Sequence, residues 1–470
     1  MTAAYALEPS ADEKRRMGQA VLEYLIGFFD RLPDAPAANA DGALEFARSL
    51  RRSAPEAGEG DFERVLATVR EAATYGFETA GPGYLAFIPG GGLFSAALAD
   101  FVATAVNRFV NISAAAPAFA QIEATVLRWL GDLFGHPPEA GGILTSGGSM
   151  ANFSALVAAR RSKLPEDFLA GTLYASEQTH ASVAKAAMLA GFPPANVRAV
   201  PTDDRLRVDV DAVVDMVKRD RDGGWTPFCI VANAGTTNTG AVDPIDALAG
   251  LAADEDLWLH ADAAYGGFFQ LTARGRAAFR GIERADSITL DPHKGLFLPY
   301  GTGCLLVRDR AALRRAHQVE AAYLQDISAE QEIPNFADLS PELSRDFRGL
   351  RVWLPIVLHG LDAFARALDE KLDLASFLYE ELRGTPGFDL PWEPDLTVVP
   401  FRYRPRSGDV DAFNRALLER INESGRVFLS STLIDGRFTI RACILSHRTH
   451  RDRVEEAVEI IRRAARALDA

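Results

Sequence analysis

Three short segments of this 470-residue chain carry residue types that together could perform amine chemistry. The first, TSGGSMAN at residues 145–152, follows an apolar run and opens a helical stretch. The free N–H groups and the dipole of a helix N-terminus attract anions, so this segment could hold a phosphate group. It lacks the spacing of a nucleotide P-loop, and an ordinary strand-to-helix turn capped by serine is the alternative for this segment alone.

The second and third segments supply a carboxylate and an amine. Asp262 ends an otherwise apolar run within LWLHADAAYG at residues 257–266. A carboxylate in a buried strand needs a partner, since breaking a buried ion pair costs about 3–5 kcal/mol; a helix cap is the alternative. Lys294 follows the apolar run at 287–290 and adjoins His293. Such an amine is suited to Schiff-base formation, whereas a solvated surface lysine is the alternative.

In this order, the three segments match the needs of pyridoxal 5′-phosphate (PLP). Its phosphate needs N–H donors, its ring nitrogen needs a carboxylate partner, and its aldehyde needs an amine. Ligands of parallel sheets bind beyond the carboxyl ends of the strands, where these segments are expected to lie. The sequence therefore predicts a PLP site built from residues 145–152, Asp262 and Lys294.

The same segments make the chain similar to a known family. From about Tyr75 to Arg448 it resembles the group II PLP-dependent amino-acid decarboxylases of fold type I, whose best-known members act on aromatic L-amino acids. The motifs are TSGGSMAN, QTHASV at 178–183, AGTT at 234–237, HADAAYGG at 260–267 and DPHKG at 291–295. The resemblance implies that Gly148 and Ser149 contact the phosphate, with Asp291 near it in place of a frequent asparagine. It implies that His180 stacks on the ring, Thr237 lies at the 3′ oxygen side and Asp262 pairs with the ring nitrogen. Lys294 is implied to bond to the aldehyde, with His293 beside it.

The resemblance further implies residues for the reaction and for the substrate. Tyr323, within EAAYLQ at 320–325, matches the tyrosine of a loop over the active site that returns a proton to the substrate carbon. With Lys294, Asp262 and His180 it completes the implied catalytic set. The implied substrate contacts are Phe87, Ile88, Pro89 and Gly90, with Phe109 and Asn111 contributed by a partner subunit. Arg441 also has a family counterpart, but an arginine on an outer strand face would need no function.

Several positions depart from the aromatic-specific members of the family. Met150 lies where glutamate is frequent, and three glycines follow Pro89 where those members are bulkier. Asn111 is polar where relatives with aromatic substrates often carry phenylalanine. On pattern alone, the phenylalanine-rich stretches also fit an ordinary core. These departures leave an acidic or other non-aromatic substrate open.

The elements that must position these residues follow from hydrophobic spacing. Short apolar runs recur about every thirty residues with helical stretches between most of them, which is typical of βα units and a parallel sheet. The runs lie at 143–144, 173–174, 197–200, 228–231, 257–259, 287–290 and 304–307. The last gap is too short for a crossover helix, so the final strand is predicted to run antiparallel. The expected fold class is α/β, PLP-dependent fold type I, with a mixed, mostly parallel seven-stranded sheet.

The chain is predicted to divide into three parts. Residues 1–80 form a helical N-terminal arm, 81–353 a large PLP-binding domain, and 354–470 a small α/β C-terminal domain. In the last part, helices are expected at 360–382, 409–421 and 451–468, and strands at 396–403, 426–433 and 437–445. Asp435-Gly436 is a strong hairpin-turn dipeptide between the last two strands.

Composition excludes several other classes of protein. Hydrophobic residues make up 48% and charged residues 24%, which argues against a disordered or fibrous chain. A net charge of −14 argues against nucleic acid as a partner. The three cysteines, Cys229, Cys304 and Cys443, fit neither a disulfide framework nor a metal site and indicate a reducing, cytoplasmic compartment. No long apolar run or apolar leader is present, so no membrane association is expected.

The expected activity is PLP-dependent decarboxylation of an L-amino acid, with aromatic substrates favoured, to the amine and CO₂. The resemblance implies a homodimer whose subunits complete each other's active sites. An aldehyde synthase on the same scaffold is an alternative, but relatives of that kind usually lack either the histidine or the tyrosine matched by His180 and Tyr323. A transaminase is disfavoured because no arginine clamp stands out, and a PLP- or nucleotide-binding protein without turnover is disfavoured by the catalytic set.

Overall fold

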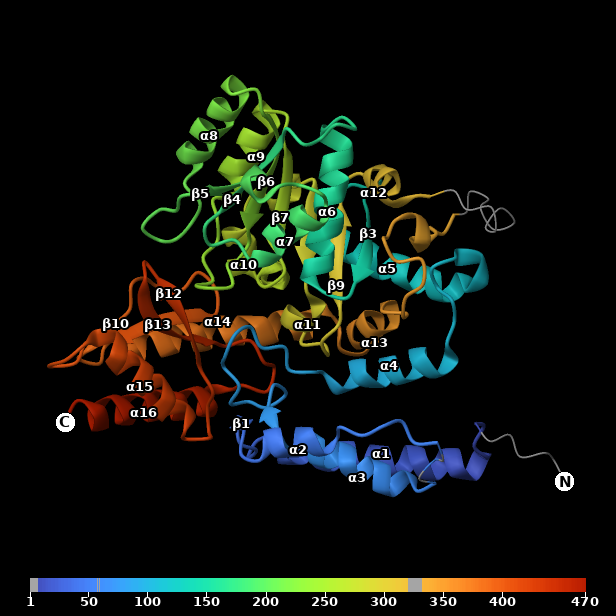
Figure 1. The fold of residues 1–470 in the computed structure, drawn as a ribbon, viewed down its shortest axis with the longest axis vertical. Helices are drawn as coiled ribbons and strands as arrows, with labels where there is room; N and C mark the ends of the chain where they lie inside the picture. Colours follow the sequence, from blue (N-terminus) through green and yellow to red (C-terminus); the bar gives the residue numbers. More distant parts are fainter. Residues whose placement is uncertain (1–6, 57, 59, 320–331) are drawn as a thin grey trace.

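The computed structural model describes residues 7–56, 58, 60–319 and 332–470. In the view of Figure 1, a central sheet and its helices form the upper part of the molecule. The N-terminal helices lie along the bottom, and the C-terminal elements lie at the lower left. Across these described ranges, no helix has both the length and the apolar character that a membrane crossing requires.

The central sheet has the predicted fold class and strand directions. Its strands are β3 (Gly141–Thr145), β4 (Gly171–Ser176), β5 (Val197–Val200), β6 (Thr226–Asn233), β7 (Trp258–Ala263), β8 (Ser287–Leu290) and β9 (Gly303–Val307). They lie in the order β3-β9-β8-β7-β6-β4-β5. The pairs from β5 to β8 are parallel, whereas β9 is antiparallel to both β8 and β3. The predicted antiparallel final strand is therefore confirmed.

Helices surround this sheet, and most of its strand residues are buried. They are α5 (Pro117–Leu133), α6 (Gly148–Lys163), α7 (Ala181–Leu189), α8 (Val210–Asp222), α9 (Ile245–Asp254), α10 (Ala273–Ala278), α11 (Pro292–Gly295) and α12 (Arg310–His317). Helix α6 packs across β6 to β9, while α9 packs on β6 and β7. Every residue of β4, β7, β8 and β9 is buried, as expected for strands covered on both faces.

The N-terminal part contains short strands that hydrophobic spacing did not predict. Its elements are α1 (Ala11–Arg31), β1 (Ala38–Asn39), α2 (Ala43–Ser49), α3 (Phe62–Ala72) and β2 (Gly76–Phe77), followed by α4 (Phe94–Val106). β1 and β2 pair antiparallel over two residues each, a length too short to give an alternating pattern. The ring of Phe29 in α1 meets that of Phe94 in α4 at a centroid distance of 5.4 Å, which fixes the arm against the rest.

The C-terminal part is a four-stranded antiparallel sheet with helices. Its elements are α13 (Gly349–His359), α14 (Leu361–Arg383), β10 (Phe388–Asp389), β11 (Val398–Tyr403), α15 (Val410–Asn422), β12 (Ser430–Ile434), β13 (Arg437–Cys443) and α16 (Arg451–Leu468). The strand order is β10-β11-β13-β12. The boundary predicted between residues 353 and 354 falls inside α13, which packs on α4 and α5. Gly360, with φ of +73°, separates α13 from α14.

Candidate active site

A cavity of about 290 Å³ lies where the segments after β3, β4, β6, β7 and β8 meet. Its volume is near the lower end of the range for cofactor and small-ligand sites. Its lining includes every residue predicted for the cofactor: Gly148, Ser149, His180, Thr237, Asp262, Asp291, His293 and Lys294. The described lining residues include none of the six predicted for the substrate, and Tyr323 lies outside the described residues. The sheet topology thus gathers the cofactor set at the carboxyl ends of five strands.

The N-terminus of α6 forms an anion cradle on one side of the cavity. The helix begins at Gly148, and its N-cap residue Gly147 offers no side-chain cap, so its first N–H groups are available to a ligand. A Cβ at Gly148 would lie 3.0 Å from Asp291 Oδ2 and 3.1 Å from the Cβ of Ala264. A side chain at this position would crowd Asp291 and Ala264, so glycine lets α6 begin close to both, and its free N–H groups fit the phosphate of PLP.

Lys294 presents its amine beside a buried carboxylate. Its Nζ lies 2.9 Å from Asp291 Oδ2, and the side chain of Asp291 is only 4% exposed. The other oxygen, Asp291 Oδ1, has no hydrogen-bond partner among the described residues. The charge of Asp291 is therefore balanced first by Lys294, a pairing that the expectation of a phosphate contact did not include.

His293, next to Lys294, is hydrogen-bonded to the residue that precedes β9. Its Nδ1 donates to the carbonyl oxygen of Thr302 at 2.7 Å. Burial lowers the pKa of His293, so the ring is neutral with its proton on Nδ1. The backbone of Gly90 packs closely against the carbonyl group of His293, because a Cβ at Gly90 would lie 2.4 Å from that carbonyl oxygen.

Asp262 lies at the end of β7 with two hydrogen-bond donors. Its Oδ2 accepts from Asn152 Nδ2 at 2.9 Å, and its Oδ1 accepts from the backbone N–H of Ala264 at 3.2 Å. The residue is 6% exposed and lines the cavity. A buried carboxylate with two donors is suited to pair with a protonated ring nitrogen.

His180 caps α7 with its own ring. Its Nδ1 accepts from the backbone N–H of Ser182 at 3.3 Å and lies 2.7 Å from Ser182 Oγ. Because a backbone N–H can only donate, Nδ1 carries no proton and the ring proton is on Nε2. This arrangement fixes the tautomer and orientation of a ring that lines the cavity.

Arg441 corrects a sequence-based expectation. The side chain is not on an outer strand face, because the residue is 4% exposed. Its Nη2 donates to the carbonyl oxygens of Phe87 at 3.0 Å and Thr237 at 2.7 Å. Burial lowers the pKa of Arg441, and its hydrogen-bond acceptors among the described residues are neutral carbonyl and hydroxyl oxygens. The guanidinium thus joins the predicted substrate segment to the cofactor cavity.

The predicted substrate segment passes beside the cavity without lining it. Phe87 has φ of +50° and is 53% exposed, and Phe109 is 44% exposed. Ile88 and Pro89 are buried within the same chain. A single chain therefore leaves the two phenylalanine rings open to a neighbour or a substrate.

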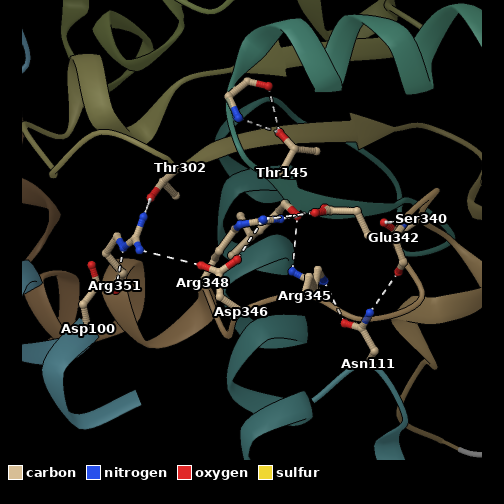
Figure 2. A network of polar contacts seen from close by, with 12 residues as sticks. Asp100, Asn111, Thr145, Thr302, Ser340, Glu342, Arg345, Asp346, Arg348 and Arg351 are labelled. Atoms are coloured by element: carbon tan, nitrogen blue, oxygen red, sulfur yellow. Dashed lines mark hydrogen bonds and ion pairs between the residues drawn. The ribbon is translucent and has the colours of Figure 1, made fainter. Parts of the chain in front are cut away.

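Asn111 has a setting that differs from the expected substrate contact. It is 1% exposed, and its Nδ2 donates to the carbonyl oxygens of Glu342 and Leu343, both at 2.9 Å. Its Oδ1 accepts from Arg345 Nε at 2.8 Å, and Arg345 also forms a buried ion pair with Glu123. Figure 2 shows Asn111 beside Arg345 at one end of this network. Within one chain the amide thus holds residues 342–345, and its contact with substrate in a partner's site stays a prediction.

The other end of the same network reaches Thr302, the hydrogen-bond partner of His293. Arg351 Nε donates to Asp100 Oδ1, and its Nη1 donates to Thr302 Oγ1, both at 2.6 Å (Figure 2). Thr302 is the residue whose carbonyl oxygen accepts from His293. Hydrogen bonds through Thr302 thus connect α13 to α11, the short helix that carries Lys294.

The sequence patterns gave no individual role to some residues of the site. Asn152 belongs to the predicted segment 145–152, and it lies four residues after Gly148 and so shares its face of α6. His260 lies two residues before Asp262 and so shares its face of β7. Arg441 stood out only through its family counterpart, because its partners Phe87 and Thr237 lie far away in the sequence.

Comparisons with known proteins agree with this geometry. The model of the pyridoxal-dependent decarboxylase conserved domain matches residues 45–404. An aromatic-L-amino-acid decarboxylase of Bacillus atrophaeus is 37% identical over 461 residues, covering 97% of this chain and 95% of the relative. A phenylacetaldehyde synthase of Arabidopsis thaliana is 27% identical, covering 98% of this chain and 97% of the relative. A crystal structure of Oryza sativa TDC with PLP and tryptamine superposes with a TM-score of 0.93 at 28% identity, covering 100% of both chains.

Proposed function

The chain belongs to the pyridoxal-dependent decarboxylase family, and we propose that it converts an aromatic L-amino acid into the corresponding amine and CO₂. It is a carboxy-lyase, and its cofactor is PLP. The observation that carries the proposal is the cavity in which an amine, a buried carboxylate and a helix N-terminus from separate loops face one space.

We assign the cofactor-binding roles from this geometry. Gly148 and Ser149 would bind the phosphate through the N-terminus of α6, and Lys294 would bond to the aldehyde carbon. Asp262 would pair with the ring nitrogen through its carboxylate, with His180 and Thr237 beside the ring. When bound, PLP supplies an aldehyde for the substrate amine and a conjugated ring that accepts the electron pair left by CO₂.

Other side chains hold or transfer the protons that the reaction requires. The amine of Lys294 must give up its pairing with Asp291, at 2.9 Å, before it can react as a nucleophile. His180 carries its proton on Nε2 and can donate a hydrogen bond from that atom. We assign Tyr323 as the acid that protonates the substrate carbon, on the family resemblance alone.

An aromatic substrate is supported by the charges of the site. Lys294 is the only lysine or arginine among the described residues that line the cavity. A side-chain carboxylate of glutamate or aspartate would lose its hydration there without gaining a cationic partner, which is unfavourable. The relative of Bacillus atrophaeus is named for aromatic L-amino acids. Phe87 and Phe109, both half-exposed, supply rings that could pack against an aromatic substrate.

A homodimer is supported by an apolar row on α4. Leu98, Phe101, Val102 and Val106 are each between 40% and 69% exposed, and Phe109 follows at 44%. Exposed apolar side chains that cluster in this way mark an association surface. We propose that a second copy of the chain covers this row and that Phe109 then completes the partner's active site. Light scattering on the purified protein should give the mass of two chains.

A panel of L-amino acids tests the proposed activity. We expect release of CO₂ and amine in equal amounts, with higher kcat/KM for tyrosine, phenylalanine or tryptophan than for glutamate or aspartate. A higher value for glutamate would refute the aromatic assignment. Aldehyde and peroxide formed in place of amine would instead identify an aldehyde synthase, the activity for which the Arabidopsis thaliana relative is named.

A further inference from the structure

A branched chain of hydrogen bonds links Asp262 to side chains on β7, β8, α6 and α7. Trp258 Nε1 donates to Ser287 Oγ at 2.8 Å, and Ser287 Oγ lies 2.8 Å from His260 Nδ1. His260 Nε2 lies 3.0 Å from Asn152 Oδ1. Asn152 Nδ2 then donates to Asp262 Oδ2 and also to Ser182 Oγ, both at 2.9 Å.

The members of this chain are shielded from water. His260 and Ser287 are 0% exposed, and Asn152 is 1% exposed. Each side chain must therefore satisfy its polar atoms within the chain of hydrogen bonds, because an unpaired buried group is costly. Solvent cannot relieve a mismatch at the links of His260 and Ser287, which are fully buried.

The two ends fix the direction of every link. The indole N–H of Trp258 can only donate, and the carboxylate of Asp262 can only accept. Asn152 must therefore turn its NH₂ toward Asp262, which leaves its Oδ1 toward His260 Nε2. His260 must then donate from Nε2 and accept at Nδ1 from the hydroxyl of Ser287.

This assignment requires a neutral His260, and its surroundings agree. Burial lowers the pKa of His260 to about 4, against the favourable charge of nearby Asp262. The hydroxyl of Ser287 can accept from Trp258 while it donates to His260, so it fills both of its roles.

We propose that His260 and Asn152 are positioning residues that act on the cofactor through Asp262: His260 sets the orientation of the Asn152 amide, and that amide holds the Asp262 carboxylate as an acceptor at the ring nitrogen of PLP. Only the contact between Asp262 and the ring nitrogen of PLP rests on the proposed function. The direction of the hydrogen bonds is a property of the cofactor-free chain.

The branch at Asn152 extends this control to the second residue beside the ring. Ser182 Oγ accepts from Asn152 Nδ2, so its hydroxyl proton is left for His180 Nδ1 at 2.7 Å. The carboxylate and the histidine that face the cofactor therefore share one amide. Neither group can reorient without disturbing the other.

Two substitutions at His260 separate this role from simple packing. His260→Gln keeps one amide donor for Asn152 and one acceptor for Ser287, whereas His260→Leu removes both at similar volume. The dissociation constant for PLP is measured for both variants, with unfolding temperatures as a control of the fold. We expect roughly 10- to 100-fold weaker binding for His260→Leu, and binding within about threefold of wild type for His260→Gln.

Nitrogen NMR of the cofactor-free wild-type protein provides the second readout. With ¹⁵N-labelled histidine, and the His260 signals assigned from their loss in His260→Gln, we expect a proton on Nε2 and a bare Nδ1. A proton on Nδ1, or equal PLP affinities for the two variants, would overturn the proposal. If His260→Leu does not fold, the NMR result alone decides. A wild-type protein that binds no PLP would refute the proposed function but leave this tautomer measurement valid.

Discussion

Replacing Asp262 tests whether the cavity needs a carboxylate opposite the cofactor's ring nitrogen. The residue is 6% exposed, and its two oxygens accept from Asn152 Nδ2 at 2.9 Å and from the N–H of Ala264 at 3.2 Å. Asp262→Ala removes the anion and leaves a protonated ring nitrogen without a partner. Breaking a buried pair costs about 3–5 kcal/mol, so PLP should bind roughly 10²- to 10⁴-fold more weakly.

Asp262→Asn is the sharper variant because it keeps size and shape. The new amide has one oxygen and one NH₂, whereas both of its neighbours are donors. Whichever way the amide turns, one donor of Asn152 or Ala264 meets another donor. We therefore expect this variant to lose about 1–3 kcal/mol in addition to the charge, rather than to rescue the alanine variant.

Both variants are assayed by absorbance titration with PLP and by kcat/KM for CO₂ release. Circular dichroism and unfolding temperature control for the fold. Near wild-type affinity and turnover in Asp262→Ala would show that the carboxylate only caps the segment after β7. Asp262→Asn that binds PLP as tightly as wild type would refute the donor pattern.

Three further results are expected. Arg441→Met should raise KM and weaken PLP binding at least tenfold, since three carbonyl oxygens and one hydroxyl lose their hydrogen-bond donor. Unchanged kinetics would show that the arginine has no role in the site. Tyr323→Phe should slow amine formation roughly 10²–10⁴-fold and yield aldehyde and peroxide under air but not under nitrogen, because a positioned acid is lost; an unchanged amine rate would exclude that role. Burial lowers the pKa of both His136 and His260 to about 4 from the usual 6.5, so the unfolded chain binds more protons between those values. Stability should therefore fall as pH drops from 6.5 to 4, by up to about 1.4 kcal/mol per pH unit for each histidine, and urea midpoints that stay flat over this range would contradict it.

The central sheet and the order of its cofactor loops could be predicted because buried parallel strands are continuous apolar runs. Asp262 and Lys294 stand out against such runs as charged residues at strand ends. Parallel topology then carries both to one edge of the sheet. The antiparallel β9 followed from the short connection after β8.

The features that could not be predicted from the sequence depend on contacts between distant residues, which the spacing of residue types does not encode. Arg441 looks like an alternating strand residue, and only the folded chain shows that its guanidinium is buried against Thr237 and Phe87. The hydrogen bonds of the Asn111 amide to Arg345 and to residues 342–343 likewise join segments more than 200 residues apart, which spacing could not predict. β1 and β2 are too short to leave any pattern in the sequence.

Lys294 is expected to bond to PLP in the cavity at the carboxyl ends of the strands. Reduction of the purified, cofactor-loaded protein with borohydride, followed by peptide mapping, tests this bond most directly. We predict a yellow protein whose pyridoxyl group maps to Lys294, and a Lys294→Ala variant that takes no label. A label on any other lysine, or full labelling of Lys294→Ala, would contradict it.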